Sequence, residues 1–281
     1  MKIFVTGVSG QLGYDVVKEG KLQGYDVSGT TSKELDITNE QAVSIFVNDI
    51  KPNVIIHCAA YTAVDAAEDD KPSCYDVNVN GTKYLAQAAK AIGAKFIYIS
   101  TDYVFNGEGE NPFTETDKTS PIGFYGKTKL EGEQLVQQLL DKYFIVRISW
   151  VFGKNGNNFV KTMLRLEETR DVVSVVGDQF GSPTYTVDLA KLIMEMVDSE
   201  KYGLYHASNT GFCSWAEFAE AIFKQSEKAI QVNSISTSEY PTRAKRPKNS
   251  RLSKAKLKEA RFAELPSWQD ALARYLKELE V

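Results

Sequence analysis

The stretch KIFVTGVSGQLG, residues 2–13, decides the fold. Residues 2–6 are a strand-like apolar run, and glycines at 7, 10 and 13 separate it from a helical stretch that extends to about residue 19. This order of strand, glycine turn and helix lets the backbone approach a pyrophosphate and directs a helix N-terminus at it. A glycine turn needed only for tight packing is the alternative. Because the motif opens an alternating α/β pattern, we interpret it as a dinucleotide site.

Outward from this motif, strand-like runs recur at residues 25–30, 52–58, 95–100 and 144–149, with helical stretches between them. A capping box, Thr38 to Gln41, predicts a helix to about residue 50, and another helix is expected over residues 72–92. This alternation predicts a right-handed, Rossmann-type doubly wound parallel sheet.

Beyond residue 150 the pattern becomes mixed. Helices are expected near residues 157–168, 186–197, 214–225 and 267–279, with a strand over residues 172–176. We therefore expect a cofactor-binding domain in residues 1–152, rejoined by part of 178–198. Residues 153–281 should form a smaller, mainly C-terminal α/β substrate-binding domain.

Composition narrows the class of protein. The chain has 281 residues, 43% hydrophobic and 25% charged, which suffices for a full globular core. A net charge of −4 and a pI near 5.5 predict no binding to nucleic acid or anionic membranes. Cys58, Cys74 and Cys213 are isolated and there are two histidines, so no zinc site is expected. No secretion signal or membrane-length apolar run is evident, and we expect a cytoplasmic protein.

The end of the second predicted strand bears on cofactor choice. A strict NAD binder places an acid there for the ribose hydroxyls, whereas this chain has Thr30-Thr-Ser-Lys33. Hydroxyls and Lys33 could accept a 2′-phosphate, so the expected cofactor is NADPH or NADH. Asp36 is expected near the adenine, with a solvated loop acid as the alternative. Small residues at 59–62 follow the third strand, where ligands of doubly wound sheets collect.

Tyr125 and Lys129 are the candidate catalytic pair. Four residues apart at the start of a predicted helix, they should lie on one face. An ammonium about 4 Å from a phenol, at an effective dielectric of about 20, favours tyrosinate by roughly 4 kcal/mol. Such a tyrosine, its pKa brought toward neutrality, could protonate a developing alkoxide during carbonyl reduction, with Thr101 as second hydrogen-bond partner. An ordinary amphipathic helix start is the alternative.

Two further polar positions have two interpretations each. Asn78, in the predicted helix 72–92, is either a structural hydrogen-bonding residue or part of a proton relay behind Lys129. Arg246 lies in a basic, irregular segment over residues 240–253. It is either solvated or a guanidinium that binds a diphosphate.

Six motifs occur in register: STDYVF (100–105), YGKTK (125–129), SWVF (149–152), GNNF (156–159), DQFGSPT (178–184) and RPKNSRL (246–252). Together they resemble the extended short-chain dehydrogenase/reductase family that acts on nucleotide sugars. The resemblance is to its branch that reduces the C4 ketone of dTDP-linked 4-keto-6-deoxy sugars. It implies Tyr125 as proton donor, Lys129 as the residue that tunes it, and Thr101 as the residue that polarises the ketone.

The predicted binding residues form two groups. Those for the cofactor are Gly7, Gly10, Gln11, Leu12, Gly13, Thr30, Asp36, Ile37, Ala59, Ala60, Tyr61, Thr62, Ser100, Tyr125 and Lys129. Those for the sugar nucleotide are Thr101, Asp102, Tyr103, Trp150, Asn158 and Arg246.

Departures from the family pattern leave alternatives open. Some members of the family hold a magnesium ion between protomers. Asp15 could match one of its ligands, but Val187 stands where another acid is expected, so no metal is predicted. The chain is expected to be a monomer or a homodimer. Dehydratases of the family carry a glutamate where this chain has Tyr103. A reductase or epimerase of another nucleotide 4-keto sugar remains possible. So does a non-catalytic, NADP-binding regulatory subunit of the methionine adenosyltransferase type.

Overall fold

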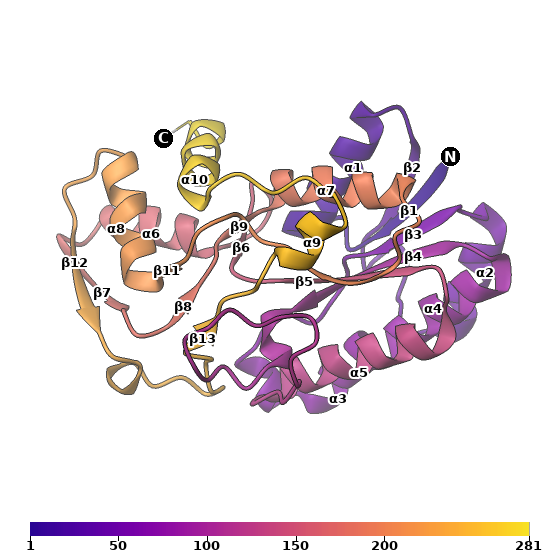
Figure 1. Cartoon of the computed structure of the whole chain (residues 1–281), viewed down its shortest axis with the longest axis horizontal. Coiled ribbons are helices and arrows are strands. Elements are labelled where there is room, and N and C mark those ends of the chain that lie inside the picture. Colours follow the sequence, from indigo (N-terminus) through magenta and orange to yellow (C-terminus); the bar gives the residue numbers. More distant parts are fainter. Residues whose placement is uncertain (281) are drawn as a thin grey trace.

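The computed structural model describes residues 1–280 and is organised around a six-stranded parallel sheet (Figure 1). Its strands are β1 (Lys2–Thr6), β2 (Asp26–Thr30), β3 (Val54–His57), β4 (Lys95–Thr101), β5 (Tyr143–Ile148) and β10 (Gly203–His206). Their order is β10-β5-β4-β3-β1-β2, and every neighbouring pair is parallel. Because β2 and β3 flank β1 on opposite sides, the winding direction changes at β1. A crevice at the carboxyl ends of the strands is expected at such a point.

Helices cover both faces of this sheet (Figure 1). α1 (Gln11–Leu22) and α7 (Thr186–Asp198) pack together on one face, and α2 (Glu40–Ile50), α4 (Gly81–Ile92) and α5 (Phe124–Leu139) cover the other. A short helix, α3 (Lys71–Tyr75), and a wider π-type turn over Asp76–Asn80 lead into α4. The helix expected over residues 72–92 is therefore one continuous helical segment that contains a π-helical turn. The predicted α/β fold with a central parallel sheet is confirmed.

The second lobe has its own hydrophobic core and lies at the left of Figure 1. It contains α6 (Phe159–Glu167), β7 (Val172–Val176), α8 (Trp215–Gln225), β12 (Gln231–Ile235) and α10 (Trp268–Glu278). Short strands lie between the lobes: β6 (Val151–Phe152), β8 (Phe180–Gly181), β9 (Thr184–Tyr185), β11 (Cys213–Ser214) and β13 (Asn249–Ser250). The helix α9 (Ala255–Glu259) packs beside β10 in the core of the main sheet. The predicted capping box from Ser214 to Glu217 opens α8.

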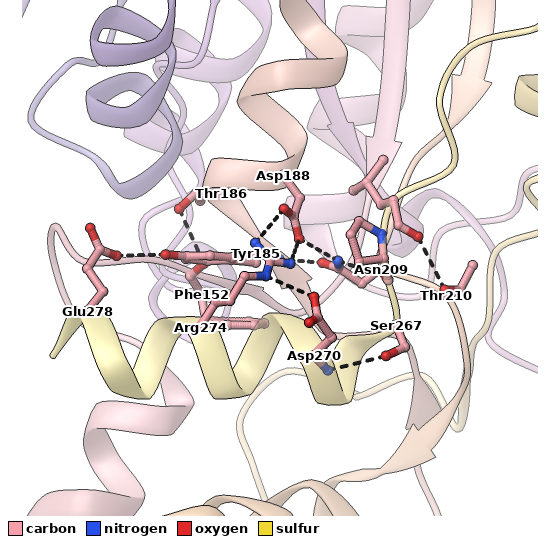
Figure 2. Close-up of polar contacts among 12 residues, drawn as sticks. Phe152, Tyr185, Thr186, Asp188, Asn209, Thr210, Ser267, Asp270, Arg274 and Glu278 are labelled. Carbon is pink, nitrogen blue, oxygen red and sulfur yellow. Dashed lines mark hydrogen bonds and ion pairs between the residues drawn. The ribbon is translucent and has the colours of Figure 1, made fainter. Parts of the chain in front are cut away.

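A polar network fastens the C-terminal helix to the start of α7 (Figure 2). Arg274 of α10 donates two hydrogen bonds to the buried Asp188, at 2.6 and 2.7 Å, and another to Asp270. Asn209 also donates to Asp188, and the Tyr185 hydroxyl donates to Glu278 at 2.7 Å. Since α7 packs on α1, this network links the second lobe to the helix that follows the glycine turn.

One local expectation was wrong, and one strand of the main sheet was missed. The capping box predicted at Thr38 does not form, because the Thr38 hydroxyl donates to Asp36 and the side chain of Asn39 caps α2 at the Ala42 N–H. The strand β10 had not been predicted at all, although it completes the main sheet beside β5. Within residues 1–280, every helix is too short or too polar to cross a bilayer.

Candidate active site

A cavity of about 780 Å³ opens at the carboxyl ends of β1 to β5. Its wall contains every predicted cofactor-binding and catalytic residue and three further residues predicted for the substrate. These residues are Gly7, Gly10, Gln11, Leu12, Gly13, Thr30, Asp36, Ile37, Ala59, Ala60, Tyr61, Thr62, Ser100, Thr101, Asp102, Tyr103, Tyr125, Lys129 and Trp150. The fold thus brings together six segments that are far apart in the sequence.

The glycine turn fits a dinucleotide. Gly7 has φ of +73°, and a Cβ there would lie 2.7 Å from the backbone of Ala59. A Cβ on Gly13 would collide with the carbonyl of Gly7. Gly10 is the N-cap of α1, and it has no side chain that could accept hydrogen bonds from the first N–H groups of the helix. These free N–H groups and the bare backbone suit a pyrophosphate.

Tyr125 lies in the first turn of α5, as predicted, and is 9% exposed. Its ring meets that of Tyr103 edge to face, with centroids 5.6 Å apart. Burial raises the pKa of Tyr125, the Asp102 carboxylate raises it further, and the Thr101 hydroxyl opposes both. The prediction of a tyrosine pKa near neutrality is therefore wrong for this structure, because desolvation and the Asp102 carboxylate both favour the protonated phenol. The phenol consequently carries its proton at neutral pH.

Lys129 is one turn further along α5 and only 2% exposed. Its Nζ lies over the ring of Tyr98, 4.1 Å from the centroid. Burial lowers the pKa of Lys129 to about 7, and the carboxylate of Glu133 opposes that shift. Glu133 itself is held by Arg147 of β5 at 2.6 Å, in a pair that is buried on both sides. A lysine in this environment is poised to gain or lose charge near neutral pH.

Thr101 and Asp102 follow directly at the end of β4. The Thr101 hydroxyl donates to Asp102 Oδ1 at 3.0 Å and accepts from the Tyr103 N–H at 3.2 Å. Burial raises the pKa of Asp102 to about 6, with hydrogen bonding from Ser250 and Thr101 opposing it. Both side chains are buried on the cavity wall. A carbonyl oxygen placed between Thr101 and Tyr125 would meet the Tyr125 hydroxyl and, once it turns away from Asp102, the Thr101 hydroxyl.

Comparison with known proteins identifies the family to which this geometry belongs. The profile of the RmlD substrate binding domain matches residues 1–281. A dTDP-4-dehydrorhamnose reductase of Aggregatibacter actinomycetemcomitans is 44% identical over 96% of this chain and 97% of its own length. The chain belongs to the RmlD family, that of the dTDP-4-dehydrorhamnose reductases.

Solved structures of RmlD-type reductases agree with this assignment. A dTDP-4-dehydrorhamnose reductase of Clostridium acetobutylicum is 46% identical and superposes with a TM-score of 0.98 over all of both chains. One from Bacillus anthracis, in complex with NADP, is 45% identical with a TM-score of 0.96 over 99% of both chains. Family membership makes this chain an NAD(P)H-dependent oxidoreductase.

In this RmlD-family chain, Trp150 has an unusual setting. It lines the cavity with a left-handed backbone, φ +49°, which bulky residues rarely adopt. One face of its indole stacks on Trp215, with centroids 3.6 Å apart, and a Cβ on Gly181 would collide with the ring. At most one face is thus available to a sugar. Strained backbone held by packing at a cavity wall is typical of functional positions.

Two residues predicted for the substrate lie outside the cavity wall. Asn158 caps α6 and donates to Gln11, the carbonyl of Gly153 and the Tyr275 hydroxyl, so its amide is used by the fold. Arg246 donates to Asp65 and, at 3.2 Å, to the Tyr103 hydroxyl. Arg246 therefore reaches the edge of the site through Tyr103, and Asn158 reaches it through Gln11.

The side chain of Asn78 is buried and hydrogen-bonded within the fold. Its Oδ1 accepts from the Tyr61 N–H at 2.8 Å, and its amide nitrogen donates to the Tyr61 carbonyl and the Thr128 hydroxyl. These bonds hold the Tyr61 loop against α5. They support the structural interpretation of Asn78, and the relay interpretation stays a prediction.

Sequence reasoning missed part of the wall. The additional residues are Thr6, Ser9, Thr31, Ser32, Leu35, Cys58, Val64, Val77, Ile99, Ile148, Ser149, Val151, Gly156 and Asn157. Most of them adjoin predicted residues, so the rule that ligands gather at strand ends could have found them. Gly156 and Asn157 come from the loop before α6, and only the GNNF motif pointed to that loop.

Asp15 lies in the core between α1 and α7. Its Oδ2 accepts from the Thr186 hydroxyl at 2.5 Å, and burial raises its pKa. Val187 is partly buried against the second core. Among residues 1–280, no three His, Cys, Asp or Glu side chains are grouped to hold a metal ion.

The helix of Tyr125 is capped by a residue far away in sequence. Its N-cap, Gly123, has no side chain, and Glu68 Oε1 accepts from the Phe124 N–H at 2.8 Å instead. We expect Glu68→Ala to cost about 1 kcal/mol of stability, the value of a helix cap. It should also lower kcat several-fold, because the capped residue adjoins Tyr125. Steady-state kinetics and thermal melts would measure both.

Glu68→Gln is the matched control, since its amide oxygen can still accept that hydrogen bond. It should restore both stability and kcat. A Glu68→Ala enzyme that melts early but turns over normally would limit Glu68 to a structural role.

Proposed function

We propose that this protein reduces the C4 ketone of dTDP-4-dehydro-L-rhamnose, with NADPH or NADH, to give dTDP-L-rhamnose. The observation that carries the proposal is the meeting of Thr101, Tyr125 and Lys129 with the glycine turn in one cavity. Relatives named dTDP-4-dehydrorhamnose reductase match the chain over nearly its whole length.

The cofactor, when bound, supplies the hydride. Its pyrophosphate would be held by the glycine turn and the α1 N-terminus, and its adenosine half by the segments at Thr30, Asp36 and Ile37. Ala59 to Thr62 and Ser100 would lie along the remainder of the molecule. The residues of the chain then have to orient the ketone and provide one proton.

Tyr125 is the proposed general acid. Because its pKa is raised, it holds a proton that it can give to the oxygen at C4 as negative charge develops there. Thr101 would donate a second hydrogen bond to the same oxygen after release from Asp102. The charged form of Lys129 would stabilise the tyrosinate that remains.

The sugar nucleotide would lie on the other side of the cavity. Trp150 offers apolar indole surface to the 6-deoxy side of the sugar. Asp102 and Tyr103 would contact its hydroxyls. Arg246, which already donates to Tyr103, is the proposed cationic contact of the diphosphate.

A nicotinamide absorbance assay at 340 nm with a panel of dTDP- and UDP-linked 4-keto sugars tests this function. We expect oxidation of NADPH or NADH with dTDP-4-dehydro-L-rhamnose and a much lower kcat/KM with the UDP-linked sugars. Turnover confined to another sugar of the panel would replace the proposed substrate. No turnover with any sugar, together with tight binding of a protein partner in the presence of NADP, would favour a regulatory subunit.

A further inference from the structure

The turn after β2 contains a carboxylate that the sequence pattern does not place there. Thr31 and Glu34 close this turn through backbone bonds from the Glu34 and Leu35 N–H groups to the Thr31 carbonyl. The side chain of Glu34 folds back: its Oε2 accepts from the Thr31 N–H at 2.8 Å and from the Thr31 hydroxyl at 2.9 Å. Thr30, Thr31 and Ser32 line the cofactor cavity. The carboxylate therefore occupies two hydrogen-bond donors at the cavity edge.

This edge is where dinucleotide folds distinguish their cofactors. The group about 20 residues beyond the glycine turn meets the adenosine ribose: an acid there suits the 2′-hydroxyl of NAD, whereas donors and cations suit the 2′-phosphate of NADP. The segment Thr30 to Lys33 has no acid. The turn geometry supplies one from Glu34 and at the same time withdraws the donors of Thr31.

We propose that Glu34 sets the balance between NADH and NADPH in this protein. The inference rests on the cofactor site of the proposed function. A 2′-phosphate that used the Thr31 donors would have to displace the Glu34 carboxylate and would remain near its charge. A 2′-hydroxyl brings no charge and can itself donate to a carboxylate. Glu34 thus disfavours NADPH without affecting the hydride-transfer end of the cavity.

The surroundings of Glu34 keep this effect moderate. Glu34 is exposed, and its hydrogen bonds from Thr31 lower its pKa, so it is ionised at neutral pH. Solvent screens such a charge, and the neighbouring ammonium of Lys33 opposes it. The second acid of the region, Asp36, is bonded through Oδ1 to the N–H and hydroxyl of Thr38. Glu34 should therefore bias the choice of cofactor and not exclude NADPH.

The test is direct binding of both cofactors to Glu34→Gln, by nicotinamide fluorescence titration without any sugar. Glutamine keeps an acceptor for Thr31, so the turn is preserved and the charge is removed. We expect the ratio of the Kd for NADPH to that for NADH to fall about fivefold at low salt, the size of one exposed charge interaction. The change should shrink as ionic strength rises.

Glu200→Gln is the control, because it removes the same charge from an exposed position just before β10, the edge strand on the opposite side of the main sheet from β2. It should leave the ratio unchanged. An equal shift in both variants, or an equal loss of affinity for both cofactors in Glu34→Gln, would overturn the proposal. A shifted ratio in a protein that turns over none of the sugars would support the role of Glu34 and reject the proposed function instead.

Discussion

Tyr125→Phe is expected to lower kcat by about 10²–10⁴-fold, the range of general acid catalysis. The substitution removes one hydroxyl and keeps the ring that packs edge to face on Tyr103. Burial holds the proton on Tyr125 at neutral pH, so the wild-type enzyme is in the form that can donate. Stability should change by about 1 kcal/mol or less, the usual value of a hydrogen bond.

Steady-state kinetics at saturating NADPH, with thermal melts, measure both effects of the Tyr125 change. Tyr103→Phe is the matched control, because it removes the neighbouring hydroxyl, which accepts from Arg246. That variant should raise KM for the sugar nucleotide more than it lowers kcat. If Tyr125→Phe retained wild-type kcat, the proton would have to come from another group.

Much of the fold could be predicted because its signals are local. The glycine turn and the alternating apolar runs identify the parallel sheet, and most predicted helices begin within two residues of their observed starts. Helical spacing pointed to the Tyr125 and Lys129 pair, and the glycine turn and the family resemblance supported its catalytic interpretation. Site residues gathered in one cavity because parallel strands end at the same edge, a property of the topology and not of each residue.

What could not be predicted depends on contacts between distant segments. β10 has four residues and becomes a strand only by pairing with β5. Asp65 and Arg246 are 181 positions apart in the sequence, and only the fold shows that they pair. This pairing brings the basic segment 240–253 to Tyr103. The prediction of the Tyr125 pKa failed for the same reason. Helical spacing placed Tyr125 and Lys129 one turn apart on a helix, but it did not give the burial that raises the pKa of Tyr125 and lowers that of Lys129.

Lys129→Met is expected to lower kcat by about 100-fold and yet to stabilise the protein. The charge lost is the one proposed to stabilise the tyrosinate, and an ion interaction at about 4 Å in a partly polar site is worth a few kcal/mol. Thermal stability should move in the opposite direction, because Lys129 is buried and its charged form is costly there. Few structural replacements would change stability and turnover in opposite directions.

The stability gain should depend on pH in a defined way. The pKa of Lys129 is about 7 in the folded protein and 10.5 for an ordinary lysine. Below pH 7 both states hold the proton, and the folded state bears the full cost of the buried charge. Between pH 7 and 10.5 the folded lysine loses its proton first, so wild-type stability rises. The stability advantage of the Lys129→Met variant should therefore be on the order of 5 kcal/mol at pH 6 and vanish by about pH 10.5.

Chemical denaturation across this pH range, together with kcat at each pH, separates a catalytic charge from a structural one. Lys127→Met, an exposed change on the same helix, is the control and should alter neither quantity. Wild-type kcat should decline as pH rises through about 7, where Lys129 loses its charge, and the Lys129→Met variant should lack that limb. A Lys129→Met variant that is less stable at pH 6 and keeps its kcat would show that the ammonium serves packing instead, through its contact with the Tyr98 ring.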